Sequence, residues 1–411
     1  MTHDLDDDIK QSLRHHAATT PARPDLARTA IRRARGIRRR RRVTGAVAVL
    51  AAAVIAVPVG LRAGDLVAQD NQPDVVDPGP DPVPDDVADP TQDPAEREPD
   101  PFEQPIDLAE LDDGPAPALP YVQGSTFHAG DQTLELDVPA SGIRALAHAD
   151  GTVFYRVDGA DGSELRTRSA SDEWPPTLGA LSAGPWASPD DRYVVYLPAG
   201  DGGGDAGQEL VALDMQAPPG EGGRVDLGAP AAELRAGFAG DRVWFTTRQG
   251  LRTWTIGESQ VVEVAGIRRP TAVASDGSLV ADMVSTDDFG SCTEVKEIST
   301  GTALWETCEH RILGFSTDGS YAWGASSYGD GYADAYNVVL DARTGAELIR
   351  VEDAFFMTSR FEDDDSLLIQ LEQDGTTALV RCTVGAGTCE TAAAARAGSV
   401  DTQDAPYVLG S

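Results

Sequence analysis

Four cysteines carry the most informative chemistry in this sequence, and they fall into two pairs. Cys292 and Cys308 flank the stretch CTEVKEISTGTALWETC, and Cys382 and Cys389 flank CTVGAGTC. Each stretch has a strand, a turn with glycine and a return strand, so the paired thiols can face each other across adjacent strands. This spacing favours the disulfides 292–308 and 382–389 over the other two connectivities. Such disulfides indicate an oxidising compartment outside the cytoplasm.

Zinc is the alternative use of these cysteines, but their spacing is not C-x2-C and His310 is the only imidazole nearby. Two acidic runs, residues 201–205 (DGGGD) and 363–365 (DDD), lack the D-x-D-x-D-G spacing and closing glutamate of a calcium loop. We therefore expect solvated turns there. The pair His15 and His16 has no third ligand in its neighbourhood. The sequence thus predicts no metal site.

The motifs of common enzymes are absent from the sequence. There is no GxSxG, since GASSYG has its serines at the wrong offset, and there is no HExxH, P-loop or dinucleotide fingerprint. Only His128, His148 and His310 fall in the C-terminal part of the chain. We therefore predict no catalytic residues and no cofactor, and we expect a protein that binds rather than catalyses.

Short strand-like runs, which would have to position any site, fill residues 121–411. Examples are TVFYRV, YVVYL, RVWFTT and SLLIQLE, which are rich in β-branched and aromatic residues. A tight turn with aspartate recurs between such runs, at Asp150, Asp190, Asp241, Asp276, Asp318 and Asp364. The successive spacings are 40, 51, 35, 42 and 46 residues, similar to the ~40–45 residues of one propeller blade.

The second half of each unit repeats as well. VVLDARTGAELIRVE contains LDxxTGxxL, which resembles the outer hairpin of quinoprotein-like repeats, while SPD and SDG resemble WD-type and TolB-type repeats. The resemblance covers residues 143–395 and implies an all-β fold, a β-propeller, without implying an activity. STFHAGDQTLELDV near the start and PYVLG near the end could complete one composite blade. We therefore favour seven blades over six.

Charge is distributed unevenly along the 411 residues. Residues 1–42 carry 12 Lys+Arg against 5 Asp+Glu, whereas the whole chain has a formal net charge of −34. Within residues 121–411 there are 45 acidic and 19 basic residues. A domain with this excess of acidic residues repels nucleic acid and other polyanions. We therefore predict no nucleic-acid partner and expect a basic protein face, or a cationic or neutral ligand.

An uncharged stretch of 19 residues, VTGAVAVLAAAVIAVPVGL, occupies residues 43–61. As a helix it matches the ~30 Å hydrocarbon core of a bilayer. The arginine run before it, Arg38, Arg39, Arg40, Arg41 and Arg42, predicts a membrane partner with the N-terminus in the cytoplasm. A buried helix and a cleaved signal peptide are the rival interpretations. Residues 1–42 then form a basic cytoplasmic tail, and the C-terminal part is extracytoplasmic.

Residues 62–120 are predicted to be a disordered, acidic, proline-rich linker. The last fifty of them contain 13 prolines, 15 acidic residues and one base, Arg97. Proline lacks the backbone donor and the acids repel one another, so neither helix nor sheet is expected. The linker would hold residues 121–411, the predicted propeller domain, away from the bilayer.

This layout resembles single-pass membrane proteins of actinobacteria with an extracytoplasmic β-propeller. It implies a membrane-anchored binding, sensing or scaffold module for an extracytoplasmic protein or small ligand. The alternatives are a propeller hydrolase or lyase, and a transmembrane regulator resembling an anti-sigma factor with a cytoplasmic partner of the tail. The tail has no cysteine, unlike many such factors. Aromatic candidates, which blade cores would also explain, are Trp186, Trp244, Trp254, Trp305 and Trp323.

Overall fold

The protein divides into two compact units, residues 1–88 and 89–411. The computed structural model describes residues 102–160, 162–171, 174–199, 208–218, 221–227, 236–247, 250–287, 290–328, 334–398 and 405–410, all in the second unit. The predicted tail, membrane helix and first part of the linker lie outside these residues. Within them, no helix has the length and apolar character needed to cross a bilayer.

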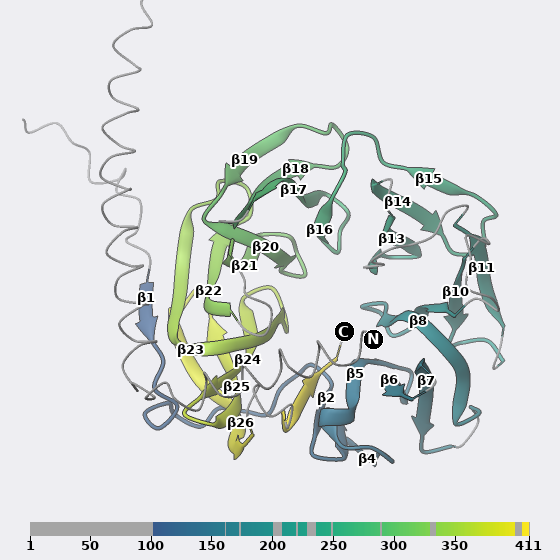
Figure 1. The fold of residues 1–411 in the computed structure, drawn as a ribbon, viewed down its shortest axis with the longest axis horizontal. Helices are drawn as coiled ribbons and strands as arrows, with labels where there is room; N and C mark the ends of the chain where they lie inside the picture. Colours follow the sequence, from purple (N-terminus) through teal and green to yellow (C-terminus); the bar gives the residue numbers. More distant parts are fainter. Residues whose placement is uncertain are drawn as a thin grey trace, which may run out of the picture. The chain divides into compact units, whose positions relative to one another are not determined.

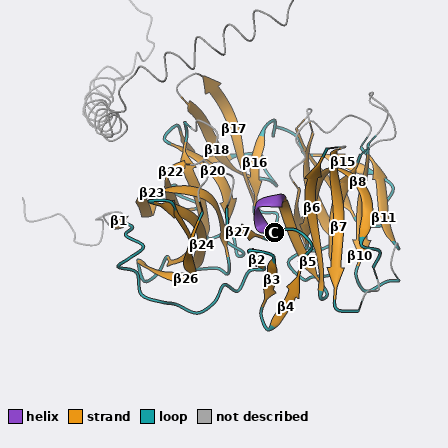
Figure 2. Ribbon diagram, turned by 60° about the horizontal axis from the view of Figure 1, so that its bottom comes forward, coloured by secondary structure: helices purple, strands orange, loops and turns teal. Residues whose placement is uncertain are grey.

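The described part of the second unit is all-β, with its sheets side by side around a common centre (Figure 1). This arrangement is a β-propeller. Neighbouring strands pair antiparallel, with one parallel exception at β1 (Phe102–Pro105). A short 3-10 helix, η2 (Ala140–Gly142), is the one helical element of the described residues (Figure 2).

Three of the sheets have four strands each. Their orders are β27 (Tyr407–Leu409), β2 (Tyr121–Gln123), β3 (Thr126–Ala129), β4 (Gln132–Glu135); β12 (Ala236–Ala239), β13 (Arg242–Thr247), β14 (Gly250–Thr255), β15 (Val261–Glu263); and β16 (Pro270–Val273), β17 (Leu279–Asp287), β18 (Gly290–Glu297), β19 (Ala303–Thr307).

Two larger sheets complete the set. One runs β5 (Ile143–Ala149), β6 (Thr152–Gly159), β7 (Gly162–Ser169), β8 (Thr177–Ala187), β9 (Tyr193–Pro198), β10 (Glu209–Asp214), β11 (Gly222–Asp226). The other runs β20 (His310–Phe315), β21 (Tyr321–Ser326), β22 (Asp334–Asp341), β23 (Glu347–Phe361), β24 (Ser366–Gln373), β25 (Thr376–Thr383), β26 (Thr388–Ala397), with β1 attached to β23.

One long strand joins two groups within each larger sheet. β8 pairs with β7 through residues 177–180 and with β9 through residues 181–187. β23 pairs with β22 through residues 347–356 and with β24 through residues 355–361. Each of these sheets therefore consists of two four-stranded groups, each the size of the three smaller sheets.

The aspartate turns join the first two strands of a group. Asp150 and Gly151 connect β5 to β6, and both have a positive φ, as Asp-Gly hairpin turns require. In the turn between β20 and β21, Asp318 accepts hydrogen bonds from the Ser320 amide and from the Ser316 and Ser320 hydroxyls. These contacts are local and require aspartate, serine or glycine at fixed positions, which explains why the repeat can be recognised in the sequence.

The second described strand, β2, and the last, β27, meet in one sheet. β2 pairs with β27, so Tyr121 lies opposite Leu409 and Gln123 lies opposite Tyr407. Tyr407 is buried and its carbonyl accepts a hydrogen bond from Gln370 at 3.1 Å. The pairing is the one expected for the composite blade, and it closes the ring.

The predicted linker is shorter than the sequence suggested, because residues 102–120 pack on the domain. β1 adds to β23 in register, and Asp113 forms a bridge with Thr391. Arg381 donates hydrogen bonds to the carbonyls of Pro115 and Ala116, both at 3.1 Å. We call residues 102–120 the strap. The structured part thus begins at or before Phe102 rather than at residue 121, since contacts distant in sequence order this proline-rich segment.

Two of the tryptophans are core residues packed between groups of strands. Trp254 is fully buried and donates to the Glu258 carbonyl at 2.9 Å. Trp305 donates to the Ala342 carbonyl at 2.9 Å and lies against Gly345, where a Cβ would come within 2.8 Å of its ring. These two side chains pack between neighbouring groups of strands, with Trp254 fully buried and Trp305 partly buried against the core.

Candidate functional site

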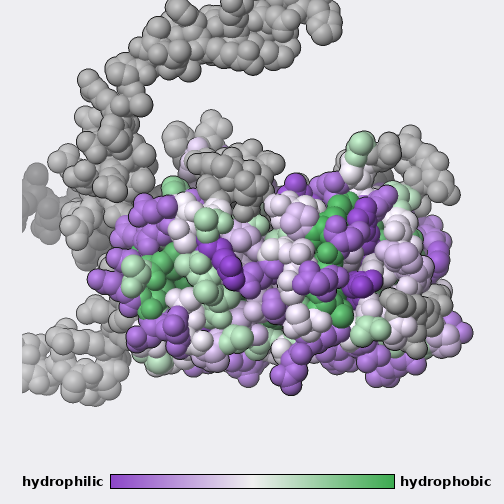
Figure 3. Space-filling view, turned by 90° about the horizontal axis from the view of Figure 1, so that it is seen from below, coloured by the Kyte–Doolittle hydropathy of each residue, from purple (hydrophilic) through white to green (hydrophobic). Residues whose placement is uncertain are grey.

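A central cavity is the main candidate site. It has a volume of about 980 Å³, and all five sheets contribute to its wall, largely through their innermost strands. The outer surface seen in Figure 3 is mostly hydrophilic, with separated hydrophobic patches. The cavity differs from that surface because it mixes aromatic rings, hydroxyl groups and a small number of charges.

Aromatic side chains form much of the apolar wall. They include Trp186, Phe238, Trp244, Phe315, Trp323 and Phe356. Trp323 packs tightly against Gly314, where a Cβ would lie 2.1 Å from the indole nitrogen, so only glycine fits opposite this ring. Three of the five tryptophans singled out from the sequence therefore line the cavity. Trp244 is buried, and its indole N–H has no hydrogen-bond partner among the described residues.

Most charges in the cavity wall are already paired. Arg311 lies 3.3 Å from Asp334, and Glu362 forms a buried ion pair with Arg381. Arg360 is the exception: the structure gives its side chain neither a hydrogen bond nor an ion pair among the described residues, although solvent in the cavity reaches it. The surrounding protein lowers the pKa of Arg360 by desolvation, but a guanidinium remains protonated at neutral pH.

A second polar group in the wall consists of His148 and Asp191. His148 lies at the end of β5, with Nε2 3.0 Å from the Gln132 amide oxygen. Burial lowers the pKa of His148, so its imidazole is neutral at pH 7. Asp191 occupies the β8–β9 turn with a φ of 57°, and burial, assisted by Asp190 and Asp150, raises the pKa of its carboxyl.

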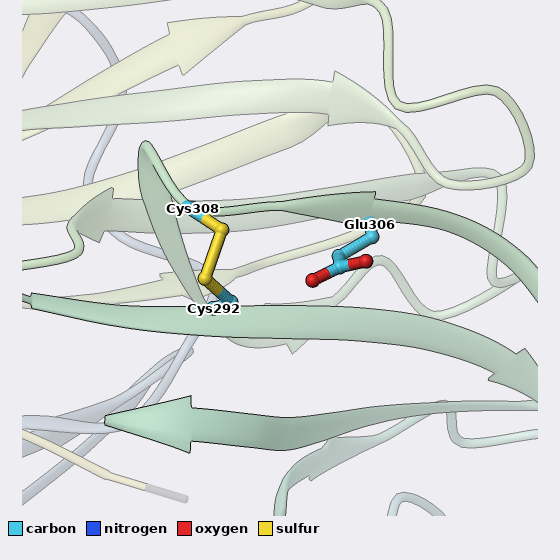
Figure 4. Close-up of side chains that lie close together, drawn as sticks. All are labelled: Cys292, Glu306 and Cys308. Atoms are coloured by element: carbon cyan, nitrogen blue, oxygen red, sulfur yellow. A yellow bond between two sulfur atoms is a disulfide. The ribbon is translucent and has the colours of Figure 1, made fainter. Parts of the chain in front are cut away.

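The cysteines form both disulfides expected from their spacing. The Cys292–Cys308 disulfide joins β18 to the residue that follows β19, with a Cα–Cα distance of 4.0 Å. Cys382 lies directly opposite Cys389, with a Cα–Cα distance of 4.1 Å. Glu306 lies beside the first disulfide (Figure 4). Oxidised sulfurs are not thiolate ligands, so the three side chains do not make a metal site.

One further cluster has metal-ligating side chains, Glu309, His310 and Glu347. Arg350 lies between the two carboxylates of this cluster. Its Nε is 3.0 Å from Glu347 and its Nη2 is 3.4 Å from Glu309. Both ring nitrogens of His310 are also engaged, with the Tyr336 hydroxyl at 3.0 Å and Glu347 at 2.9 Å. The Arg350 guanidinium already pairs with both carboxylates, so the cluster is an internal ion-pair network.

The acidic run at residues 363–365 behaves as a turn. The Asp363 carboxylate accepts hydrogen bonds from the amides of Asp365 and Ser366, and Asp365 accepts one from Gly385. Its oxygens are used to hold the β23–β24 connection, as expected for a turn. The other acidic run, residues 201–205, lies outside the described residues.

Sequence reasoning singled out the cysteines and tryptophans but did not find Arg360 or the pair of His148 and Asp191. Asp191 directly follows Asp190 of a recurrent turn, and this position is the one sequence signal for the pair. For Arg360 there is no such signal, because the absence of a partner is a property of the folded chain.

No protein-family model and no curated protein matches this chain. Similar solved structures include TolB from Acinetobacter baumannii, with 16% identity and a TM-score of 0.38 over 56% of this chain and 62% of that chain. This chain thus spans less than two thirds of that TolB. An oligogalacturonate lyase in complex with manganese has 14% identity and a TM-score of 0.43, covering 61% and 82%. Oligopeptidase B from Leishmania major has 11% identity and a TM-score of 0.46, over 70% of this chain and 50% of that chain.

Proposed function

We propose that this protein is a membrane-anchored binding or sensing module whose extracytoplasmic propeller takes a ligand into its central cavity. The observation that carries this proposal is the cavity itself, with aromatic walls and one cation, Arg360, that has no partner among the described residues. Within the described wall, no hydroxyl is hydrogen-bonded to a histidine and every carboxylate except that of Asp191 has a basic partner. A site that holds a ligand needs no more than this, whereas hydrolysis usually needs a nucleophile with its base or two cooperating carboxylates.

The propeller has seven blades in this proposal. The three four-stranded sheets supply three blades, and the two larger sheets supply two each by sharing β8 and β23. The blade made of β27, β2, β3 and β4 is the composite one.

The membrane orientation rests on the arginine run and on the disulfides. Arg38 to Arg42 precede the apolar residues 43–61, whereas only Arg62 follows them closely. Cys292–Cys308 and Cys382–Cys389 fit an oxidising exterior.

A reporter that fluoresces only in the cytoplasm is expected to be bright when fused before Met1 and dark when fused after Ser411. Neutralising Arg38 to Arg42 should weaken this preference, because the positive-inside bias is lost. The reverse pattern of fluorescence would contradict the orientation.

If the ligand binds in the cavity, a bulky side chain that fills part of the cavity should weaken binding. Ser275 lines the cavity in the β16–β17 turn, whereas Ser299 is exposed in the β18–β19 turn of the same sheet. In calorimetric titrations of the full chain with sugars, amino acids and carboxylates, Ser275→Trp should weaken binding by about tenfold or more, since about 1.4 kcal/mol suffices for that change. Ser299→Trp is the matched control and should bind as the unmodified protein does.

Two results would speak against a binding module. If every compound that binds does so equally well in Ser275→Trp, the cavity is not the site. If the full chain turns over one of these compounds and His148→Gln or Asp191→Asn abolishes turnover, the protein is the propeller enzyme instead, because these two are the acid–base groups of the described wall that form no ion pair.

A further inference from the structure

We propose that the central cavity recognises the carboxylate of a small monoanionic ligand through the guanidinium of Arg360. This inference rests on the proposed function, namely that the cavity is the ligand site. It replaces the expectation, drawn from total charge, that the domain prefers cationic or neutral ligands.

The first step is the isolation of Arg360 in an acidic domain. Residues 121–411 contain 45 acidic and 19 basic residues, so an arginine has many carboxylates with which it could form an ion pair. Several other described arginines do so, as Arg192 pairs with Asp214 at 3.0 Å and Arg166 pairs with Asp137 at 2.6 Å. Arg360 lines a cavity and has no such partner among the described residues. Since the Arg360 side chain is exposed in the cavity wall and has no described partner, its donors remain available to a ligand.

The second step is the fixed position of Arg360. It lies near the end of β23, between Ser359 and Phe361, which are 1% and 9% exposed. The Ser359 hydroxyl donates to Asn337 at 3.2 Å, and Arg360 itself pairs in register with Leu368 of β24. The backbone that carries the guanidinium is thus held in a sheet. A guanidinium offers two parallel N–H donors, which match the two oxygens of a carboxylate.

The third step limits the charge of the ligand to one. Arg311 is paired with Asp334, and Arg381 with Glu362, so neither pair adds positive charge to the cavity. Asp191 adds a carboxylate whose neighbour, His148, is neutral. The Arg360 guanidinium is then the one positive group of the described wall without a carboxylate partner, and with Asp191 already negative a phosphate or a tricarboxylate would place surplus negative charge in an acidic domain.

The fourth step concerns the body of the ligand. Trp186, Phe315 and Trp323 give the cavity flat apolar walls. Rings pack against aromatic faces and gain from the removal of water. We therefore infer a monocarboxylate that carries a neutral ring.

The test uses the full chain and calorimetric titration with sodium benzoate and sodium glucuronate, whose rings differ in polarity. Benzamide serves as the neutral isostere of benzoate, and sodium phosphate and sodium citrate serve as multivalent anions. We expect at least one of the two carboxylates to bind saturably, and benzamide, phosphate and citrate to bind at least about tenfold more weakly, in line with the ~1.5–3 kcal/mol of a hydrogen bond to a charged group.

Arg360→Met should weaken binding of that carboxylate by about tenfold or more, and Arg360→Lys should retain part of it, because lysine keeps the charge and loses the paired donors. Arg268→Met is the matched control, since Arg268 is exposed, lies outside the cavity wall and has no side-chain partner among the described residues. Urea unfolding of Arg360→Met should match that of the unmodified protein, because the Arg360 side chain makes no hydrogen bond or ion pair with the described residues.

The outcomes separate this inference from the proposed function. If Arg360→Met binds the carboxylate normally while Ser275→Trp does not, the cavity is the site but Arg360 does not recognise the ligand. If both variants bind normally, both ideas fail. Equal binding of benzoate and benzamide, preference for phosphate or citrate, or no binding of either carboxylate would also overturn the inference.

Discussion

Replacing Arg381 with methionine is expected to destabilise the propeller by about 3 to 5 kcal/mol, the usual cost of removing one partner from a buried ion pair. The Glu362 side chain is 1% exposed, so Arg381→Met leaves a carboxylate without solvent or counter-ion. Arg381 also donates to Glu390 at 2.9 Å and to two carbonyls of the strap. Urea unfolding monitored by tryptophan fluorescence measures the loss.

Two further variants test the cause of that loss. Arg343→Met is the matched control, because Arg343 forms an exposed ion pair with Glu297 and such pairs contribute about 0 to 1 kcal/mol. Arg381→Met combined with Glu362→Gln should recover part of the stability, since the amide is neutral and still accepts from the Ala118 amide. Limited proteolysis within residues 102–120 should accelerate in Arg381→Met. A loss no greater than that of Arg343→Met would refute the role assigned to this pair.

A second large effect is expected from Glu347→Gln, and it should depend on pH. Burial alone would raise the pKa of Glu347, but hydrogen bonds from His310 and Arg350, together with their charges, lower it from 4.5 to about 2. A depressed folded-state pKa stabilises the fold above the unfolded value of 4.5, and this stabilisation disappears as the pH falls towards 2. At neutral pH it amounts to roughly 2 to 3 kcal/mol, allowing for partial exposure.

Urea unfolding at pH 6.5 and at pH 3 measures this dependence. The free energy of unfolding should differ between the unmodified protein and Glu347→Gln by roughly 2 to 3 kcal/mol at pH 6.5, and by clearly less at pH 3. Glu209→Gln is the matched control, because Glu209 and its partner Arg224 are exposed by 52% and 66%. A difference that stays constant between the two pH values would show that Glu347 acts through packing and not through its charge.

The sequence predicted those features whose causes are local. Asp150–Gly151 and Asp318–Gly319 need positive φ at their glycines, and this requirement leaves a visible mark on residue type. The hairpin between Cys382 and Cys389 is equally local, since the residues at its two ends are seven apart. Recurrence of such turns was enough to indicate a propeller.

Features that depend on distant contacts were missed. The strap looked like a continuation of the linker, since Pro115, Pro117 and Pro120 are typical of unfolded chain. Its order comes from distant contacts such as those of Arg381, which is 265 residues away from Ala116. The lack of a partner for Arg360 among the described residues has the same origin, because it depends on where the acidic side chains lie in the folded chain.

The closing blade has a consequence for the biosynthesis of the domain. β27 follows every other described strand in the chain, yet its partner β2 is the second. Until residues 407–409 have been made, the inner edge of β2 has no strand to pair with, and an unpaired edge invites pairing with other chains. The N-terminal strands of this domain therefore cannot finish folding before the C-terminal end of the chain is made, whereas the N-terminal domains of many proteins fold during synthesis. A truncated product lacking Tyr407 would retain an open edge, which gives proteases and chaperones a simple criterion by which to recognise it.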